Sequence, residues 1–286
     1  MSTPSESKSE WVVETTSETF QRDVFERSRE TPVVVDFWSR TCQPCLMLAP
    51  ILEGLAEQFA GQFVLVKAEA EHNQQPAADF QVRGIPAVFA VVGGEVVDFF
   101  EGLLPAEHVR GWIDRMLLIG DMVKAGRLEE SDPIESETLY RKVLEAAPNE
   151  SAATIGLARA LLNQKREDDC RAILEKLERR GFLEPEAEKL KASLHLAESK
   201  NIDVAQLRAE VESNPDDLPQ RHQLAEALAS EQKFQEALDI CLDLVQRDRQ
   251  GVGEQARQTM VDIFRVLPDE SPLTGEYRRK LASALY

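Results

Sequence analysis

The sequence predicts an α/β domain followed by an all-α domain of helical repeats. Up to about residue 115, short apolar runs alternate with segments of helical periodicity, the pattern of a mixed sheet with helices on its faces. From about residue 116 the strand patterns stop, and apolar residues keep a helical spacing. This second half also matches itself when it is shifted by 67 residues, which indicates repeated helix pairs.

Four apolar runs in the first domain have the length and composition of buried strands. They are residues 33–37, 63–67, 87–92 and 95–100. Residues 46–59, between the first two runs, have helical spacing. Gly93-Gly94 separates the last two runs, and such a pair favours the tight turn of a two-residue hairpin. A mixed sheet with at least one covering helix follows.

Two cysteines, Cys42 and Cys45, stand where the first strand gives way to the predicted helix. The free N–H groups and the positive dipole end of a helix start stabilise a thiolate, so Cys42 is the candidate nucleophile. Cys45, one turn later, can form a disulfide with Cys42 and release a captured partner. Pro44 limits the freedom of the loop between them. The pair therefore predicts thiol–disulfide exchange.

A zinc half-site or two structural thiols is the alternative for this pair. Zinc normally needs four nitrogen or sulfur ligands. The other two cysteines, Cys170 and Cys241, lie far along the chain in helical sequence without a CxxC partner. They fall on apolar helix positions, where a small core residue is expected. We therefore expect no metal and no cofactor.

Composition and charge favour a cytoplasmic protein. Neither residues 1–10 nor any later run has the apolar length of a membrane span, and four cysteines in 286 residues are too few for a secreted disulfide scaffold. The net charge of −18 divides equally, because residues 1–115 carry 9 basic and 18 acidic side chains and the remainder 24 and 33. Because the excess of acidic side chains is spread over both parts of the chain, it argues against binding nucleic acid or anionic membranes. We divide the chain into a flexible tail (1–9), the α/β domain (10–115) and the helical domain (116–286).

The repeat in the second half is close to a known helical period. The shift places Pro148 on Pro215, and twice the 34-residue tetratricopeptide period is 68. A further helix pair is therefore expected between the two copies, at about residues 185–213. An irregular helical bundle is the alternative that the repeat makes less favourable. The concave face of such a stack commonly binds partners, but no residue here identifies a ligand.

The last helix carries an apolar stripe, in which Leu273, Tyr277, Leu281 and Leu285 recur every four residues. The basic residues 278–280 lie beside it. The stripe fits two hypotheses: the helix docks on a partner, or it caps the last helix pair of the stack.

At this point the first domain resembles thioredoxin. The resemblance covers about residues 10–115 and is carried, beyond the CxxC pair, by residues at consistent spacing: Asp36, Pro50, Lys67, Gly84, Ile85, Pro86 and Gly102. It implies that Asp36 accepts and returns the proton of Cys45, with Lys67 as its neighbour. It also implies a cis Ile85-Pro86 bond facing the dithiol. The implied substrate-binding residues are Trp38, Gln43, Pro44, Leu46, Ile85 and Pro86.

The motif departs from the thioredoxin pattern at three places. Thr41, Gln43 and Leu46 stand where thioredoxins usually carry Trp, Gly and Lys. Losing the lysine removes a positive charge and adds apolar surface beside the nucleophile. We expect altered partner choice and, because the cation is lost, a higher Cys42 pKa and weaker general reductase activity.

A thioredoxin domain followed by tetratricopeptide-like repeats is similar to the bacterial chaperedoxins. That resemblance implies a holdase that binds unfolded proteins, protects their cysteines through mixed disulfides and passes them to folding chaperones, of the GroEL type and the DnaK type. The end of the chain resembles the ending of that family. It implies partner-binding residues Tyr277, Arg278, Arg279, Leu281 and Leu285, with Tyr286 following.

Three functions compete. The first is a chaperedoxin-like co-chaperone, and the second is a protein-disulfide reductase whose repeats only select partners. The third is a scaffold that keeps the fold for its shape, and the retained Cys42 and Asp36 count against it. Leu46 favours the first over the second, because an apolar rim suits unfolded chains.

Overall fold

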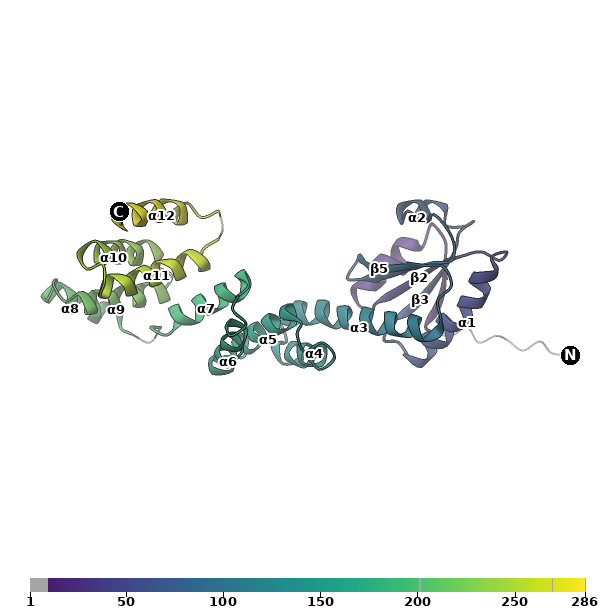
Figure 1. The fold of residues 1–286 in the computed structure, drawn as a ribbon, viewed down its shortest axis with the longest axis horizontal. Helices are drawn as coiled ribbons and strands as arrows, with labels where there is room; N and C mark the ends of the chain where they lie inside the picture. Colours follow the sequence, from purple (N-terminus) through teal and green to yellow (C-terminus); the bar gives the residue numbers. More distant parts are fainter. Residues whose placement is uncertain (1–9, 201, 269, 286) are drawn as a thin grey trace. The chain divides into compact units, whose positions relative to one another are not determined.

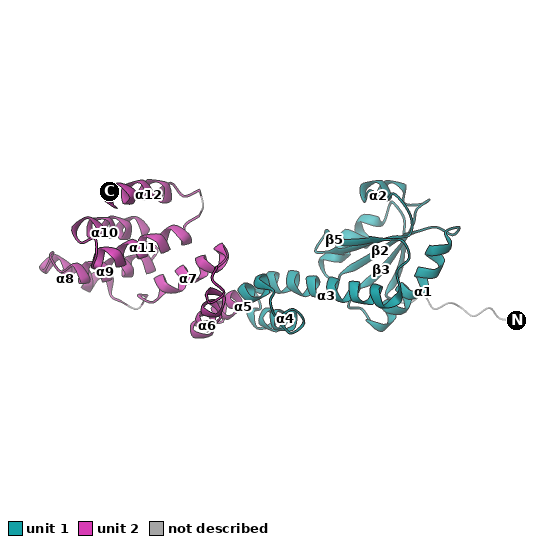
Figure 2. Cartoon of the chain, in the orientation of Figure 1, with its two compact units in different colours: residues 1–156 teal, residues 157–286 magenta. Residues whose placement is uncertain are grey.

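The computed structural model of the chain describes residues 10–285 except residues 201 and 269. The predicted flexible tail at residues 1–9 and the terminal Tyr286 lie outside the described residues. The chain forms two compact units, residues 1–156 and residues 157–286, shown in different colours in Figure 2. The boundary between them falls inside helix α5 (Ser151–Asn163).

The first unit is built on a five-stranded mixed sheet (Figure 1). Its strands lie in the order β1-β3-β2-β4-β5, with β1, β3 and β2 parallel and the β4–β5 hairpin antiparallel. The four predicted strands are confirmed, whereas β1 was not predicted. The glycine pair of the hairpin turn, Gly93-Gly94, has positive φ at both residues, as expected for this turn. The strands are β1 (Val12–Thr15), β2 (Val33–Trp38), β3 (Val64–Glu69), β4 (Ala87–Val92) and β5 (Glu95–Glu101).

Helices cover both faces of this sheet because β2 is apolar on both sides. Val34 packs with α1 (Gln43–Gln58) and α3 (Ala106–Leu128) on one face. Val33, Val35 and Phe37 pack on the other face, against a π-helical turn and α2. Since side chains alternate along a strand, Asp36 belongs to the face that α1 covers. The elements on the opposite face are η1 (Gln21–Glu26), η2 (Arg27–Arg29) and α2 (Gln74–Asp79).

Helix α3 continues through residue 115, where the sequence predicted the end of the α/β domain. The first compact unit also takes in α4 (Pro133–Ala146), which packs against α3. The Ser136 hydroxyl donates a 2.9 Å hydrogen bond to the Ala125 carbonyl of α3, and Tyr140 lies beside Gly126. The first unit thus extends beyond the sheet and its covering helices.

The described residues of the second unit form helices and the turns between them (Figure 1). The helix pair expected near residues 185–213 is present as α7 and α8, and Asp203 and Asp217 cap the starts of α8 and α9 with side-chain hydrogen bonds. Ala225 and Ala227 are fully buried and allow the close helix packing that the sequence indicated. The helices are α6 (Glu167–Glu178), α7 (Pro185–Ala197), α8 (Val204–Ser213), α9 (Leu218–Ser230), α10 (Phe234–Arg247), α11 (Val252–Val266) and α12 (Pro272–Leu285).

Cys170 and Cys241 are both fully buried in the helical part of the chain. Burial raises the pKa of the Cys170 thiol to about 12 and raises the pKa of Cys241 as well. The prediction that they are small core residues is confirmed. Among the described residues, no helix combines the length and the low polarity needed to cross a bilayer.

Candidate active site

Cys42 and Cys45 lie at the start of α1, as predicted, and form a disulfide in this structure. Cys42 is the N-cap residue, and its sulfur accepts a 3.2 Å hydrogen bond from the Cys45 N–H group. Cys42 is partly exposed, whereas Cys45 is 1% exposed. This arrangement gives an accessible sulfur for attack on a partner and a protected sulfur for the second step.

The loop before β4 lies against Cys42. The predicted cis peptide bond between Ile85 and Pro86 is present. The Ile85 carbonyl oxygen is 3.8 Å from Cys42 Sγ, and the Gly102 N–H group donates a 2.8 Å hydrogen bond to the Pro86 carbonyl. The structure therefore brings together the dithiol and the two residues that the resemblance assigned to substrate backbone.

Asp36 lies on the face of the sheet that α1 covers and is buried there, with 1% of its surface exposed. Lys67 stands directly opposite it on β3. The pKa of Asp36 is raised from 3.8 to about 7, mainly because the carboxyl group is buried; the Lys67 charge opposes the rise and the Glu53 charge adds to it. Among the described residues, no group hydrogen-bonds Asp36 Oδ1. A carboxyl group that titrates near neutral pH is suited to proton exchange with a thiol.

Lys67 is engaged by two neighbours on the same side of the sheet. Its Nζ donates a 2.7 Å hydrogen bond to Glu53 Oε1 and lies 4.9 Å from the centre of the Trp38 ring. Glu53 is a residue that the sequence interpretation missed. It lies on α1 between the buried Leu52 and Ala56, so helical periodicity could have placed it at the edge of the apolar stripe.

The surface beside the dithiol is apolar at two consecutive positions. Leu46 is 46% exposed and Met47 is 60% exposed, immediately after Cys45. Gln43 and Pro44 are also exposed, as their assignment to substrate binding requires. Trp38, in contrast, is half-buried under Lys67. Met47 was not singled out from the sequence, because an apolar residue inside a helix usually belongs to the core.

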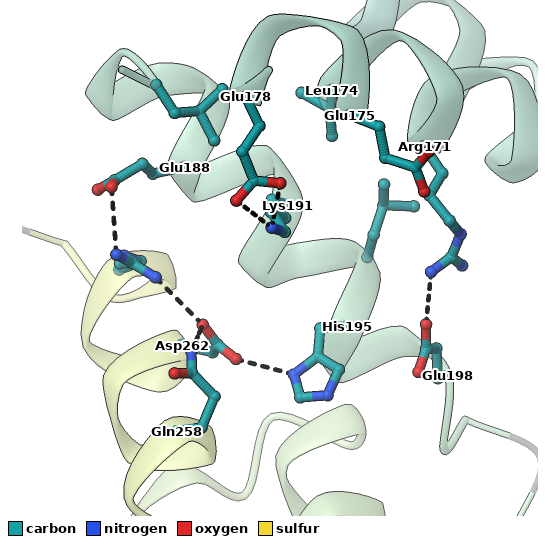
Figure 3. Close-up of a pocket in the computed structure, with 13 residues that line it drawn as sticks. Arg171, Leu174, Glu175, Glu178, Glu188, Lys191, His195, Glu198, Gln258 and Asp262 are labelled. Carbon is teal, nitrogen blue, oxygen red and sulfur yellow. Dashed lines mark hydrogen bonds and ion pairs between the residues drawn. The ribbon is translucent and has the colours of Figure 1, made fainter. Parts of the chain in front are cut away.

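The second unit contains a cavity of about 570 Å³ between α6, α7 and α11, shown in Figure 3. Its charged walls pair with one another. Arg265 pairs with Glu188 and with the buried Asp262. The other pairs, seen as dashed lines in Figure 3, are Arg171 with Glu198, Lys191 with Glu178 and His195 with Asp262. Each basic side chain that lines the cavity thus forms an ion pair with a carboxylate. We therefore interpret the cavity as a polar interface between helices.

The C-terminal helix α12 turns most of its apolar stripe inward. Tyr277 is 1% exposed and Leu281 is 8% exposed, and the Tyr277 hydroxyl donates a hydrogen bond to Asp239 of α10. Neither side chain is exposed while α12 is packed, which favours the capping hypothesis over partner binding for these two residues. Arg278, Arg279 and Leu285 are exposed.

Replacing Leu281 by alanine should destabilise the second unit by about 2 kcal/mol, because it leaves a cavity under α12. Chemical denaturation followed by circular dichroism measures the loss. The matched variant Arg279→Ser, on the exposed side of the same helix, should leave the free energy of unfolding within about 0.5 kcal/mol of wild type. Equal stability of Leu281→Ala and wild type would contradict the capping role.

Comparison with protein families matches the thioredoxin family to residues 11–115 and tetratricopeptide repeat families to residues 127–194 and 197–286. Thioredoxin C-2 of Corynebacterium nephridii is 39% identical over 104 residues, which are 36% of this chain and 94% of that protein. Thioredoxin 1 of a Nostoc species is 36% identical over 106 residues, 37% of this chain and 97% of that protein. An uncharacterized protein of Mycobacterium tuberculosis is 28% identical over 290 residues, 100% of this chain and 88% of that protein.

These similarities agree with the geometry of the site. The matched thioredoxins are covered almost completely by the first unit, and the dithiol, the buried acid and the cis-proline loop occupy one place in it. The site supports thiol–disulfide exchange. The chain belongs to the thioredoxin family, with tetratricopeptide repeats following the thioredoxin domain.

Proposed function

We propose that the chain is a chaperedoxin-like co-chaperone of the cytoplasm. It holds unfolded proteins, protects or reduces their cysteines through its dithiol, and passes them to folding chaperones of the GroEL and DnaK types. The observation that carries the proposal is the exposed pair Leu46 and Met47 next to Cys45. Apolar side chains at this position bind the apolar segments that an unfolded protein exposes.

The exchange reaction runs on the reduced dithiol. The Cys42 thiolate attacks one sulfur of a client disulfide, the client S–S bond breaks, and the other client sulfur leaves as a thiolate. Asp36 then accepts the proton of the Cys45 thiol, and the Cys45 sulfur attacks Cys42 Sγ. The bond from Cys42 to the client breaks as the Cys42–Cys45 disulfide forms. The client has gained two electrons, and the dithiol has lost two.

The tetratricopeptide repeats supply the second part of the proposal. Repeats of this kind present extended binding surfaces. Joined to a dithiol in one chain, they keep a client near Cys42, which raises the effective concentration of the client's cysteines at that sulfur. Arg278, Arg279 and Leu285, exposed on α12, remain proposed contacts for a chaperonin.

The double variant Leu46→Lys/Met47→Lys should hold clients less well, because it replaces the apolar rim by two charges. We expect it to lose at least about half of the wild-type suppression of client aggregation, measured by light scattering, while its dithiol still reduces small disulfides. The matched control is Val96→Lys. Val96 is 45% exposed in the same domain, but it pairs with Val91, at the end of β4 away from Pro86.

If both variants suppress aggregation as wild type does, the apolar rim is not the client surface. A reductase whose repeats only select partners then becomes the better account. Loss of suppression by Val96→Lys alone would equally contradict the proposal, because it would locate holding elsewhere on the domain.

A further inference from the structure

Three ionisable side chains meet on the α1 side of the sheet. Asp36 comes from β2, Lys67 from the directly opposite position on β3, and Glu53 from α1, which covers both. The Lys67 ammonium group is 2.7 Å from Glu53 Oε1. Within the described part of the chain, no ion pair joins Lys67 to Asp36, although the two residues are register partners, and Asp36 Oδ1 has no hydrogen-bond partner there.

We propose that Glu53 is a positioning residue for the exchange reaction: it holds the Lys67 ammonium group against its own carboxylate on α1, so that Lys67 does not form a direct ion pair with Asp36. The lysine has a second anchor in the Trp38 ring, 4.9 Å from Nζ. Its ammonium group thus lies between a carboxylate and an aromatic face. The proposal rests on exchange at the dithiol and is independent of client holding.

The position of the Lys67 ammonium group affects the pKa of Asp36. Asp36 is almost fully buried, so nearby charges act on it with little screening by solvent. The pKa of Asp36 is raised to about 7, mainly by burial; the Lys67 charge opposes this rise and the Glu53 charge adds to it. Glu53 thus raises the pKa of Asp36 in two ways: directly through its negative charge, and indirectly by keeping Lys67 from pairing with Asp36.

The consequence falls on the second step of the reaction. Asp36 has to be ionised to accept the Cys45 proton, and it also has to be basic enough to take it. A direct pair with Lys67 would ionise Asp36 fully but make it a weaker base. With Lys67 held by Glu53, Asp36 changes charge near neutral pH, where both requirements are met.

The variant Glu53→Gln should lower the pH at which Asp36 titrates. We expect the midpoint to fall by at least about half a pH unit, because the repelling charge is gone and Lys67 is free to approach. The direct measurement is a pH titration of the Asp36 carboxyl carbon by NMR in the oxidised full chain, assigned with Asp36→Asn. Glu57→Gln is the matched control, since Glu57 is exposed on the same helix one turn later. It should leave the midpoint within about 0.2 pH units of wild type.

A second pair of variants separates the two actions of Glu53. In a Lys67→Met background, Glu53→Gln can act only through its own charge, so we expect less than half of the shift seen with Lys67 present. An equal shift in both backgrounds would overturn the positioning role, and so would an unchanged midpoint in Glu53→Gln with intact folding.

The reaction itself provides a readout that a merely structural role would not move. In the reduced protein, the pH profile for resolution of a Cys42 mixed disulfide should shift to lower pH in Glu53→Gln, by the same amount as the Asp36 titration. The two readouts also separate two failures. If the chain resolved no mixed disulfide, exchange itself would fail, whereas the NMR titration would still test the position of Lys67.

Discussion

Replacing Cys45 by serine should convert the chain from a catalyst into a trap. Cys42 stays accessible at the start of α1 and still attacks a client disulfide, but the buried sulfur that would release the client is gone. We expect turnover to fall by at least about a thousandfold, because a well-oriented intramolecular group is worth far more than an external thiol. A covalent adduct with the client should accumulate, visible on a non-reducing gel and by mass spectrometry.

Two variants control this experiment. Cys42→Ser should form no adduct, since it lacks the accessible sulfur. Cys170→Ser changes a fully buried thiol in the helical part of the chain and should keep wild-type turnover. An adduct on Cys42→Ser equal to that on Cys45→Ser would contradict the assignment of the nucleophile.

Replacing Asp36 by asparagine should stabilise the first unit at high pH. The folded state raises the pKa of Asp36 through burial, from 3.8 to about 7, so the folded chain binds more protons than the unfolded chain between these values. The contribution of Asp36 to the free energy of unfolding therefore declines as the pH rises from about 4 to 7. The rise of the Asp36 pKa from 3.8 to about 7 corresponds to about 4 kcal/mol in the free energy of unfolding. The variant should match wild type near pH 4 and exceed it by roughly that amount at pH 8.

Tryptophan fluorescence isolates this effect, because all three tryptophans, Trp11, Trp38 and Trp112, lie in the first unit. Urea denaturation at pH 4 and pH 8 gives the two free energies of unfolding. If the stability gain of Asp36→Asn were the same at both pH values, the titration of Asp36 would not be its cause.

A second buried aspartate provides the control of opposite sign. Asp23 is 2% exposed, and although burial opposes its ionisation, hydrogen bonds from Arg22, Thr19 and Thr15 lower its pKa. The ionised Asp23 carboxylate therefore stabilises the folded state above the pKa that Asp23 has in the unfolded chain. This stabilisation is lost as the pH falls through the lower pKa of the folded state. Because the folded pKa lies below 3.8, that loss occurs mainly below pH 4. Asp23→Asn should therefore cost stability at both pH values with little change between them, unlike Asp36→Asn.

The sequence was sufficient for the centre of the sheet and for the dithiol. Strand β4 is a continuous apolar run, and β2 and β3 are apolar apart from Asp36, Lys67 and Glu69, because both of their faces are covered; that signal is strong. Strand β1 has only four residues at an edge of the sheet, and its mixture of polar and apolar residues gives no comparable signal. Local composition thus predicted the interior of the sheet better than its edge.

The site was predicted only where spacing along the chain carries the information. The positions of Asp36, Cys42 and Pro86 follow from the thioredoxin spacing. The pairing of Lys67 with Glu53 depends on how α1 lies over β3, which no local pattern contains. The stripe on α12 gave the right periodicity, but whether Tyr277 faces a partner or the stack was decided by packing against α10.

Light scattering from an aggregating client under reducing conditions distinguishes a co-chaperone from a simple disulfide reductase. It compares the full chain with its Cys42→Ser/Cys45→Ser variant. We expect both to suppress aggregation equally, because holding belongs to the folded surface, while only wild type keeps the client's cysteines reduced when an oxidant is added. If neither suppresses aggregation, with or without prior oxidant treatment, the co-chaperone account is wrong and the chain is a disulfide reductase whose repeats select its partners.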